Sequence, residues 1–259
     1  MKRMKTSTGT LYGIGVGPGD PEWITFKAHR ILTSTPVIAY PKSRPDRESY
    51  ALNIVKEWID PDQQEQLPLL FPMDGGESVR RAAREEAARR LWQPLREGRD
   101  VAFITEGDPL MYSTFIHVMT GIKAQGEEVP IRVIPGVSSV HGAAACLQLP
   151  LAEGEEKIAI LPAPARAEEL EEWMRTHDTV VLLKVAKVLD SLIDVLSQKG
   201  WLEKACVMTR VSTREEVVCH DLSELKGRTL PYFTLMILKK DGQGRENPWA
   251  SRWREERSI

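Results

Sequence analysis

The sequence predicts an α/β protein of two domains with mixed sheets flanked by helices. Short apolar runs alternate with helical patterns through most of the 259 residues, and this alternation is typical of βαβ units. The pattern changes after "PGVSS" at Pro135–Ser139, where fewer helices separate the strands. Hydrophobic residues make up 42% of the chain and charged residues 28%, which suits a globular protein with a buried core.

The first half is expected to alternate strands with helices. Its strands are predicted at Leu11–Val16, Val37–Tyr40, Leu67–Phe71, Val101–Thr105 and Ile131–Ile134. A helix from Ser78 to Glu97 combines an alanine-rich face with opposite charges four residues apart, and Gly98 ends it. The expected pairs are Arg81–Glu85, Glu85–Arg89 and Glu86–Arg90. This charged run indicates a solvated helix face.

The second half begins with a helix at Val140–Leu147. Its strands are expected at Lys157–Leu161, Val180–Leu183, Ala205–Thr209, Val217–His220 and Phe233–Leu238. We therefore predict an N-terminal α/β domain over 1–135, a C-terminal α/β domain over 136–240, and a mobile polar tail over 241–259.

Composition bounds the class of function. The net charge of −2 gives no electrostatic reason to expect a nucleic-acid partner. No apolar run approaches 18 residues, and Met1–Thr8 lacks the apolar core of a signal peptide, so we expect a cytoplasmic protein without a membrane partner. The three cysteines, Cys146, Cys206 and Cys219, lie far apart and favour buried thiols over a disulfide. The five histidines are scattered, and no metal site is expected.

Glycine recurs at every second position in "GIGVGPGD", Gly13 to Asp20. A dinucleotide fingerprint would need a third glycine where Pro18 or Asp20 stands, so that interpretation fails. The bare backbone indicates either close approach of a ligand or a plain strand-to-helix turn.

Loops with glycine or proline follow three of the predicted strands, at Gly15–Asp20, Thr105–Thr114 and Pro135–Ser139. Ligands of α/β proteins bind beyond the carboxyl ends of strands, so these loops are expected to line one cleft. Asp108 suits either a ligand contact or the N-cap of a helix opening at Pro109.

The motifs "GVGPGDPEWIT", "EGDPLMYST", "PGVSS" and "PYFTLMIL" resemble, in this order, the signatures of the tetrapyrrole (corrin/porphyrin) methylases. The resemblance spans about Thr10 to Lys239. It implies a two-domain fold with the active site in the interdomain cleft, S-adenosylmethionine as cofactor, S-adenosylhomocysteine as product, a tetrapyrrole substrate and a homodimer. Within the family, "VIAYPKSR", "FPM" and Glu106 are most similar to members that methylate carbon 20 of precorrin-2 in cobalamin biosynthesis.

The resemblance also implies roles for individual residues. Those expected near the cofactor are Pro18, Glu106, Gly107, Asp108, Met111, Ser138, Ser139, Leu183, Lys184, Val211, Phe233 and Thr234. Lys184 departs from the methionine that relatives often carry. Gly15 and Gly17 are expected to let a flat macrocycle approach the backbone.

Methyl transfer to a meso carbon needs positioning and a base for the departing proton. Glu106 and Asp20 are the catalytic candidates, with His117, on a helix expected at Tyr112–Lys123, as a further one. Lys42 and Arg44 in "YPKSR" are expected to bind substrate carboxylates, unless this segment is an ordinary exposed loop. Arg47, Arg210 and Arg214 are further basic candidates.

Other functions stay open at this level. A relative of the same fold could methylate another ring position, RNA or diphthamide, although the near-neutral charge and "YPKSR" disfavour the macromolecules. A non-catalytic adenine-nucleotide-binding module would keep the same loops. The sequence does not distinguish metal-free precorrin-2 from its cobalt-bearing counterpart.

Overall fold

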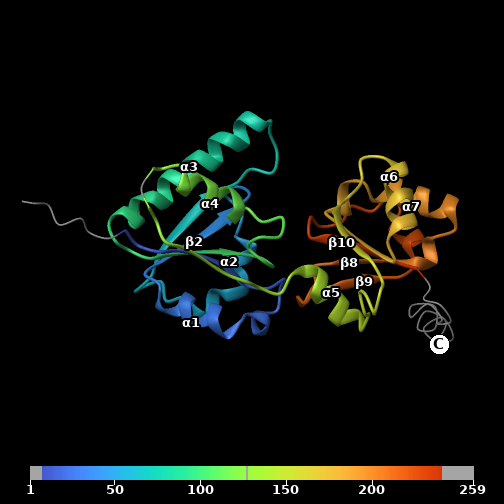
Figure 1. Cartoon of the computed structure of the whole chain (residues 1–259), viewed down its shortest axis with the longest axis horizontal. Helices are drawn as coiled ribbons and strands as arrows, with labels where there is room; N and C mark the ends of the chain where they lie inside the picture. Colours follow the sequence, from blue (N-terminus) through green and yellow to red (C-terminus); the bar gives the residue numbers. More distant parts are fainter. Residues whose placement is uncertain (1–7, 127, 241–259) are drawn as a thin grey trace, which may run out of the picture. The chain divides into compact units, whose positions relative to one another are not determined.

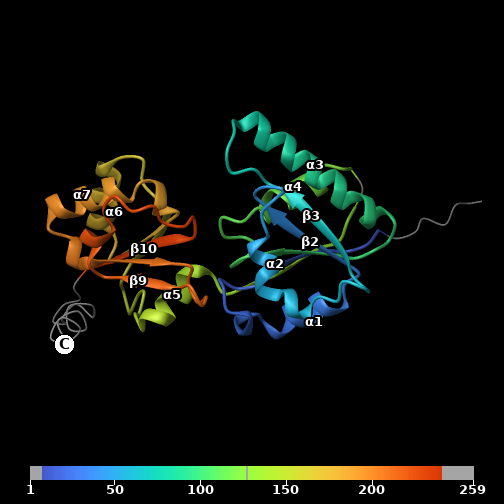
Figure 2. The same ribbon diagram turned by 180° about the vertical axis from the view of Figure 1, so that it is seen from behind.

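The computed structural model describes residues 8–126 and 128–240, and the chain divides into two compact units, Met1–Ser139 and Val140–Ile259. Each unit contains one five-stranded sheet flanked by helices, shown in Figures 1 and 2. The predicted α/β class is confirmed. The tail predicted over 241–259 lies outside the described residues.

The first unit is built on a wholly parallel sheet in the strand order β3-β2-β4-β1-β5. All its carboxyl strand ends therefore meet at one edge. The elements are β1 (Leu11–Gly15), α1 (Phe26–Ser34), β2 (Val37–Lys42), α2 (Tyr50–Val55), β3 (Glu65–Leu70), α3 (Glu77–Arg96), β4 (Val101–Thr105), α4 (Phe115–Lys123) and β5 (Ile131–Ile134).

The inner strands β1, β2 and β4 are largely buried on both faces, which explains why they are apolar runs without polar alternation. Successive residues of β4 point to opposite faces: Val101 and Phe103 join the core under α3 and α4, whereas Ala102 and Ile104 join the core under α1 and α2. Helices α1 and α2 begin at hydroxyl caps. Thr25 accepts a hydrogen bond from the Ala28 amide, and this bond starts α1.

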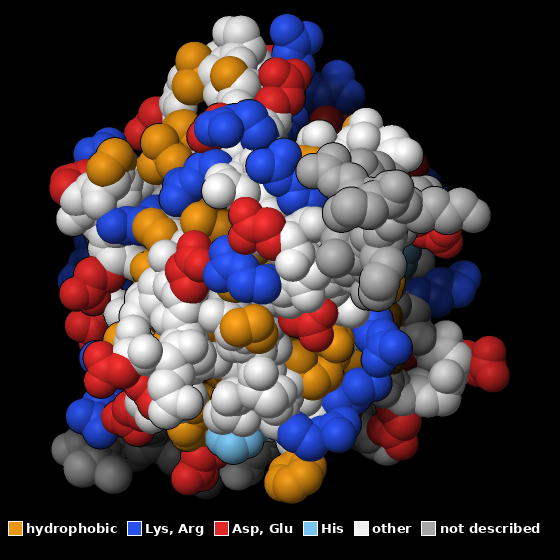
Figure 3. Space-filling view, turned by 90° about the vertical axis from the view of Figure 1, so that its left-hand side faces the viewer, with side chains coloured by type: hydrophobic (Ala, Val, Ile, Leu, Met, Phe, Trp, Pro, Cys, Tyr) orange, Lys and Arg blue, Asp and Glu red, His pale blue; other side chains and the backbone are white. Residues whose placement is uncertain are grey.

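Helix α3 buries its alanine-rich stripe and exposes its charges, as predicted. Arg81 pairs with Glu85 at 3.6 Å, but Arg89 pairs with Glu86 and Arg90 donates to the Pro68 carbonyl, so the other two predicted pairs are wrong. Three-residue and four-residue spacings both bring side chains together on a helix, and neighbouring elements decide between them. On the face shown in Figure 3, basic and acidic side chains are interspersed.

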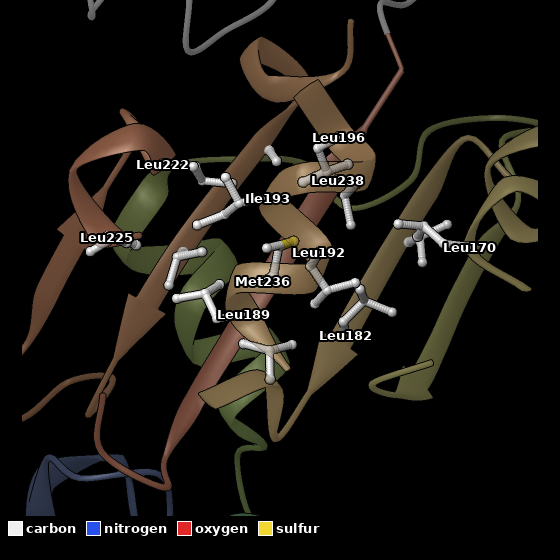
Figure 4. Close-up of a cluster of buried hydrophobic side chains, with 14 of the residues drawn as sticks. Leu170, Leu182, Leu189, Leu192, Ile193, Leu196, Leu222, Leu225, Met236 and Leu238 are labelled. Atoms are coloured by element: carbon white, nitrogen blue, oxygen red, sulfur yellow. The ribbon is translucent and has the colours of Figure 1, made fainter. Parts of the chain in front are cut away.

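The second unit has a mixed sheet in the order β6-β7-β10-β8-β9, in which β6 and β7 are parallel and the other pairs antiparallel. Leucines and isoleucines of α6 and α7 pack on one face of it, as Figure 4 shows. The elements are α5 (Ser139–Leu147), β6 (Ile158–Pro162), α6 (Ala167–Thr176), β7 (Thr179–Leu183), α7 (Leu189–Lys199), β8 (Ala205–Thr209), β9 (Val217–Cys219) and β10 (Thr234–Lys239).

The helix after β4 begins later than predicted. No helix opens at Pro109 or Tyr112; α4 starts at Phe115, after a loop in which Tyr112 has a φ of 53°. A left-handed residue cannot continue a right-handed helix, so this loop extends to Thr114. Asp108 is therefore not the N-cap of α4.

Candidate functional site

The three predicted loops of the first unit follow the adjacent strands β4, β1 and β5, so they lie at one edge of the sheet. Hydrogen bonds join them. The Gly107 amide donates to the Gly17 carbonyl at 2.8 Å, and the Val16 amide donates to the Thr105 carbonyl at 3.0 Å. The three loops thus lie together within this unit; that they line one ligand cleft stays a prediction.

Gly15, Gly107 and Gly136 let the three loops approach each other. A Cβ atom on Gly15 would lie 2.5 Å from the Gly107 carbonyl oxygen and 2.6 Å from the Gly136 nitrogen. A Cβ on Gly136 would lie 2.3 Å from the same Gly107 oxygen. Backbone atoms cannot give way as the end of a long side chain can. The space beside the Gly15 Cα is thus filled by protein backbone.

Gly13 and Gly17 need to be glycine for other reasons. A Cβ on Gly13 would lie 2.3 Å from atoms of the Phe115 ring, which packs against the bare strand. Gly17 has a φ of 83°, a conformation that side chains disfavour. Gly13, Gly15 and Gly17 therefore have structural reasons to be glycine that need no ligand.

The Asp108 carboxylate connects two of the loops. Its Oδ1 accepts a hydrogen bond from the Leu110 amide at 2.9 Å, and its Oδ2 accepts one from the Gly136 amide at 3.1 Å. Its neighbours Glu106, Gly107 and Met111 are half-buried. Asp108 thus fixes the backbone that presents these neighbours.

Ser138 lies in the loop after β5 and is only 6% exposed, and Ser139 begins α5. A Cβ atom on Gly107 would lie 3.8 Å from the Ser138 Cα and 4.0 Å from the Ser139 nitrogen, so the backbone of both serines lies beside the loop that carries Glu106.

Pro18 and Asp20 lie in the loop after β1. The Pro18 carbonyl accepts a hydrogen bond from the Tyr50 hydroxyl at 3.1 Å. The Asp20 Oδ1 accepts one from the Glu22 amide at 2.9 Å and so caps the 3₁₀ turn Pro21–Trp23. Asp20 thus has a structural role whether or not it also accepts a proton.

Lys42 ends β2 and so lies at the same edge of the first sheet as the three loops. Its ammonium donates to the Pro45 carbonyl at 2.6 Å, and Arg44 makes an exposed ion pair with Asp74 at 3.3 Å. Exposed ion pairs contribute little to stability, so Arg44 can exchange partners at low energetic cost.

His117 lies on α4 with part of its surface open to solvent. Partial burial, and then the positive charge of Arg84 on α3, lower the pKa of His117. This keeps the imidazole neutral near pH 7. His117 thus lies close enough to α3 to be affected by the charge of Arg84.

In the second unit, the predicted cofactor residues gather at one edge of the mixed sheet. Leu183 ends β7, Val211 follows β8, and Thr234 begins the antiparallel β10 between them. Leu235 pairs with Leu183, and Thr234 pairs with Thr209. Lys184 and Phe233 flank these strand ends. Segments far apart in the sequence thus meet at this edge.

Strained backbone occurs in the loop after β4 and at this edge of the second sheet. The described residues other than glycine that have positive φ are Tyr112, Gln148, Lys184, Arg210 and Ser212. Tyr112 lies in the loop after β4, and Lys184, Arg210 and Ser212 lie at the edge of the second sheet. Strained residues persist only where their surroundings hold them, and they concentrate at functional sites.

Sequence reasoning placed Tyr112 in the loop Thr105–Thr114 but also at the start of a helix, missed Ser212, and took Arg210 only as a cation. Positive φ is predicted from glycine or asparagine in a sequence, and tyrosine and arginine give no such indication.

Among residues 8–126 and 128–240, no three His, Cys, Asp or Glu side chains are grouped so as to hold a metal ion. In the same part of the chain, no helix has the length and apolar character that crossing a membrane requires.

Comparisons with known proteins point to one family. The family model of the tetrapyrrole (corrin/porphyrin) methylases matches residues 10–226. The chain is 33% identical to the cobalt-precorrin-2 C(20)-methyltransferase of Salmonella typhimurium, over 90% of this chain and 97% of that protein. It is 34% identical to a probable cobalt-precorrin-2 C(20)-methyltransferase of Methanocaldococcus jannaschii, over 89% of this chain and 96% of that protein.

A longer relative matches over only part of its length. The chain is 32% identical to the cobalamin biosynthesis protein CobIJ of Mycobacterium tuberculosis over 90% of this chain, and spans about half of that relative's length, 46%.

Solved structures share the fold. A cobalt precorrin-4 methyltransferase matches with a TM-score of 0.69 at 22% identity, covering 92% of this chain and 98% of that one. A uroporphyrin-III C-methyltransferase of Thermus thermophilus, complexed with S-adenosylhomocysteine, matches with a TM-score of 0.64 at 23% identity, covering 90% and 98%.

Proposed function

The chain belongs to the tetrapyrrole (corrin/porphyrin) methylases, and from this membership we propose that it transfers a methyl group from S-adenosylmethionine to carbon 20 of precorrin-2 or its cobalt-bearing counterpart, in cobalamin biosynthesis. The observation that carries the proposal is the similarity, over nearly the full length of both chains, to a methyltransferase named for that position. Incubation with S-adenosylmethionine and each substrate, followed by location of the new methyl group by mass and NMR, tests it.

The residues present suit S-adenosylmethionine. Its adenine has flat, apolar faces, and the second unit offers the buried side chains of Leu183 and Val211 at one sheet edge. Its ribose and amino-acid end need polar partners, and the candidates are the Thr234 and Ser138 hydroxyls and the Glu106 carboxylate. We assign Gly107, Asp108, Met111, Ser139, Lys184 and Phe233 to the same binding role, and Pro18 to its border.

When bound, S-adenosylmethionine supplies an electrophilic methyl group. The residues of the chain then have to orient the substrate carbon in line with that methyl group and accept the proton that the carbon loses. We propose Glu106, in the loop that Asp108 fixes, as the base. Asp20, in the loop after β1, remains the second candidate.

The first test concerns the product. Saturating S-adenosylhomocysteine is expected to raise the melting temperature, because a ligand that binds only the folded state stabilises it by about 2.7 kcal/mol at a hundred times its Kd. Thermal scans with the ligand, and with ATP and NAD as controls, measure this. A shift with ATP or NAD alone would support the non-catalytic nucleotide-binding module instead.

The second test concerns the substrate. Lys42→Ala and Arg44→Ala are each expected to raise the KM for the tetrapyrrole by about tenfold, because each removes a charged hydrogen bond to a substrate carboxylate. Affinity for S-adenosylhomocysteine should stay within about twofold, measured by calorimetry. Lys27→Ala on α1 removes the same charge from an exposed position and is the matched control. If both variants show normal tetrapyrrole kinetics, "YPKSR" is an ordinary solvated loop that does not bind the substrate.

We further propose that the protein acts in the cytoplasm, as a homodimer, without nucleic-acid or membrane partners. Support for the dimer comes from the family resemblance. Gly15 and Gly17 retain a proposed place beside the macrocycle, in addition to their packing roles.

A further inference from the structure

A short turn connects β8 to β9 at the edge of the second sheet and contains strained backbone. Arg210 and Ser212 have φ values of 49° and 61°, while Val211 between them is 4% exposed. The Arg210 amide donates to the Phe233 carbonyl at 2.9 Å, which holds the beginning of the turn to the segment before β10. The backbone on the other side of Val211, at Ser212, is held by a second hydrogen bond.

The Glu216 carboxylate accepts this hydrogen bond. Its Oε2 accepts a hydrogen bond from the Ser212 amide at 2.5 Å and a second from the Cys146 thiol at 3.3 Å. Cys146 lies in the last turn of α5, so one oxygen atom connects the turn to a helix 70 residues away. Charge-assisted bonds to a backbone amide are among the stronger ones in proteins.

The chemistry of Cys146 agrees with a donor role. Burial, and next the hydrogen bond to Glu216, raise the pKa of the Cys146 thiol to about 11. The thiol therefore keeps its proton at neutral pH and donates to the carboxylate. It is a poor nucleophile in this state, which separates it from reactive cysteines.

We infer that Glu216 is a positioning residue for cofactor binding: through Ser212 and Cys146 it holds the turn that presents Val211. Glu216 touches no reacting atom in this role. The inference rests on the proposed function, since it concerns the cofactor that this function requires.

The test compares Glu216 with Asp178. Each carboxylate accepts a hydrogen bond from a backbone amide, and the two lie at opposite edges of the second sheet. Asp178, just before β7, accepts a hydrogen bond from the Lys157 amide at 2.7 Å and is half-buried like Glu216. Glu216→Ala is expected to weaken S-adenosylhomocysteine binding by about tenfold in calorimetry, because the turn loses its preferred conformation. Asp178→Ala should leave this affinity within about twofold.

Conservative variants separate positioning from mere folding. Glu216→Gln keeps an oxygen that can accept from the Ser212 amide, so it should recover most of the affinity. Cys146→Ser keeps a donor and should bind as wild type, whereas Cys146→Ala should weaken binding by about two- to threefold.

Hydrogen exchange measures the conformation of the turn in the absence of ligand. In hydrogen exchange of the free protein, Glu216→Ala should speed exchange at Ser212 and in the segment 210–216, and Asp178→Ala should not. Wild-type protein that binds no S-adenosylhomocysteine would overturn the proposed function. Wild-type protein that binds it, with Glu216→Ala binding equally well, would overturn the positioning role alone.

Discussion

Replacing Gly15 with alanine is expected to destabilise the first unit by about 3 kcal/mol and to lower its melting temperature by roughly 10 °C. The new methyl group would lie 2.5 to 2.7 Å from three backbone atoms of Gly107 and Gly136, and none of them belongs to a flexible side chain. The loops after β4 and β5 must then separate. Because these loops carry Glu106 and Ser138, kcat/KM for methyl transfer should fall on the order of 100-fold.

Gly76→Ala is the matched control for this prediction. Gly76 precedes α3 in the same unit, has an ordinary negative φ, and a Cβ there would meet only the Ser78 hydroxyl at 3.9 Å. Gly76→Ala should lower the free energy of unfolding by less than about 1 kcal/mol. Calorimetric scans and methyl-transfer assays of both variants decide the matter, and a Gly15→Ala protein as stable and active as Gly76→Ala would contradict the prediction.

Phe115→Ala is expected to destabilise the first unit by about 3 to 5 kcal/mol. The ring is fully buried, lies 5.8 Å from the Phe103 ring between centroids, and fills the space left by the absent side chain of Gly13. Truncation leaves a cavity beneath the first turn of α4. Chemical denaturation followed by circular dichroism measures the loss.

A double-mutant cycle tests whether Gly13 is glycine because of Phe115. Gly13→Ala alone should cost about 1 to 3 kcal/mol, because its methyl group meets the ring. In the Phe115→Ala background the same change should cost much less, giving a coupling energy of about 1 to 2 kcal/mol. Simple additivity would show that some other neighbour requires the glycine.

The alternation of apolar runs and helical patterns was enough to determine the α/β class. Strand β4 shows why: a strand buried on both faces is apolar at every position, and "VAFIT" is unambiguous in a sequence. The alanine-rich stripe of α3 is equally local, since Ala87, Leu91 and Leu95 follow the period of a helix. The order of the four motifs supported the family, because it needs no knowledge of the fold.

Other features depended on tertiary structure. The start of α4 was placed too early because Pro109 suits a first helical turn, while the left-handed backbone of Tyr112 is held by packing that no local pattern records. Asp108 was left open between two roles, and its bond to the Gly136 amide, 28 positions away, decided what it holds.

The sequence by itself determined the strands, the fold class and the family, because periodicity and motif order are properties of neighbouring residues. Only the tertiary structure decided why particular residues must be what they are. Gly15 is glycine because Gly107 and Gly136 arrive from other strands, and Glu216 matters because the Ser212 amide and the Cys146 thiol meet at one of its oxygens. Contacts between distant segments form only when whole strands pair and helices pack, so short-range patterns carry no record of them.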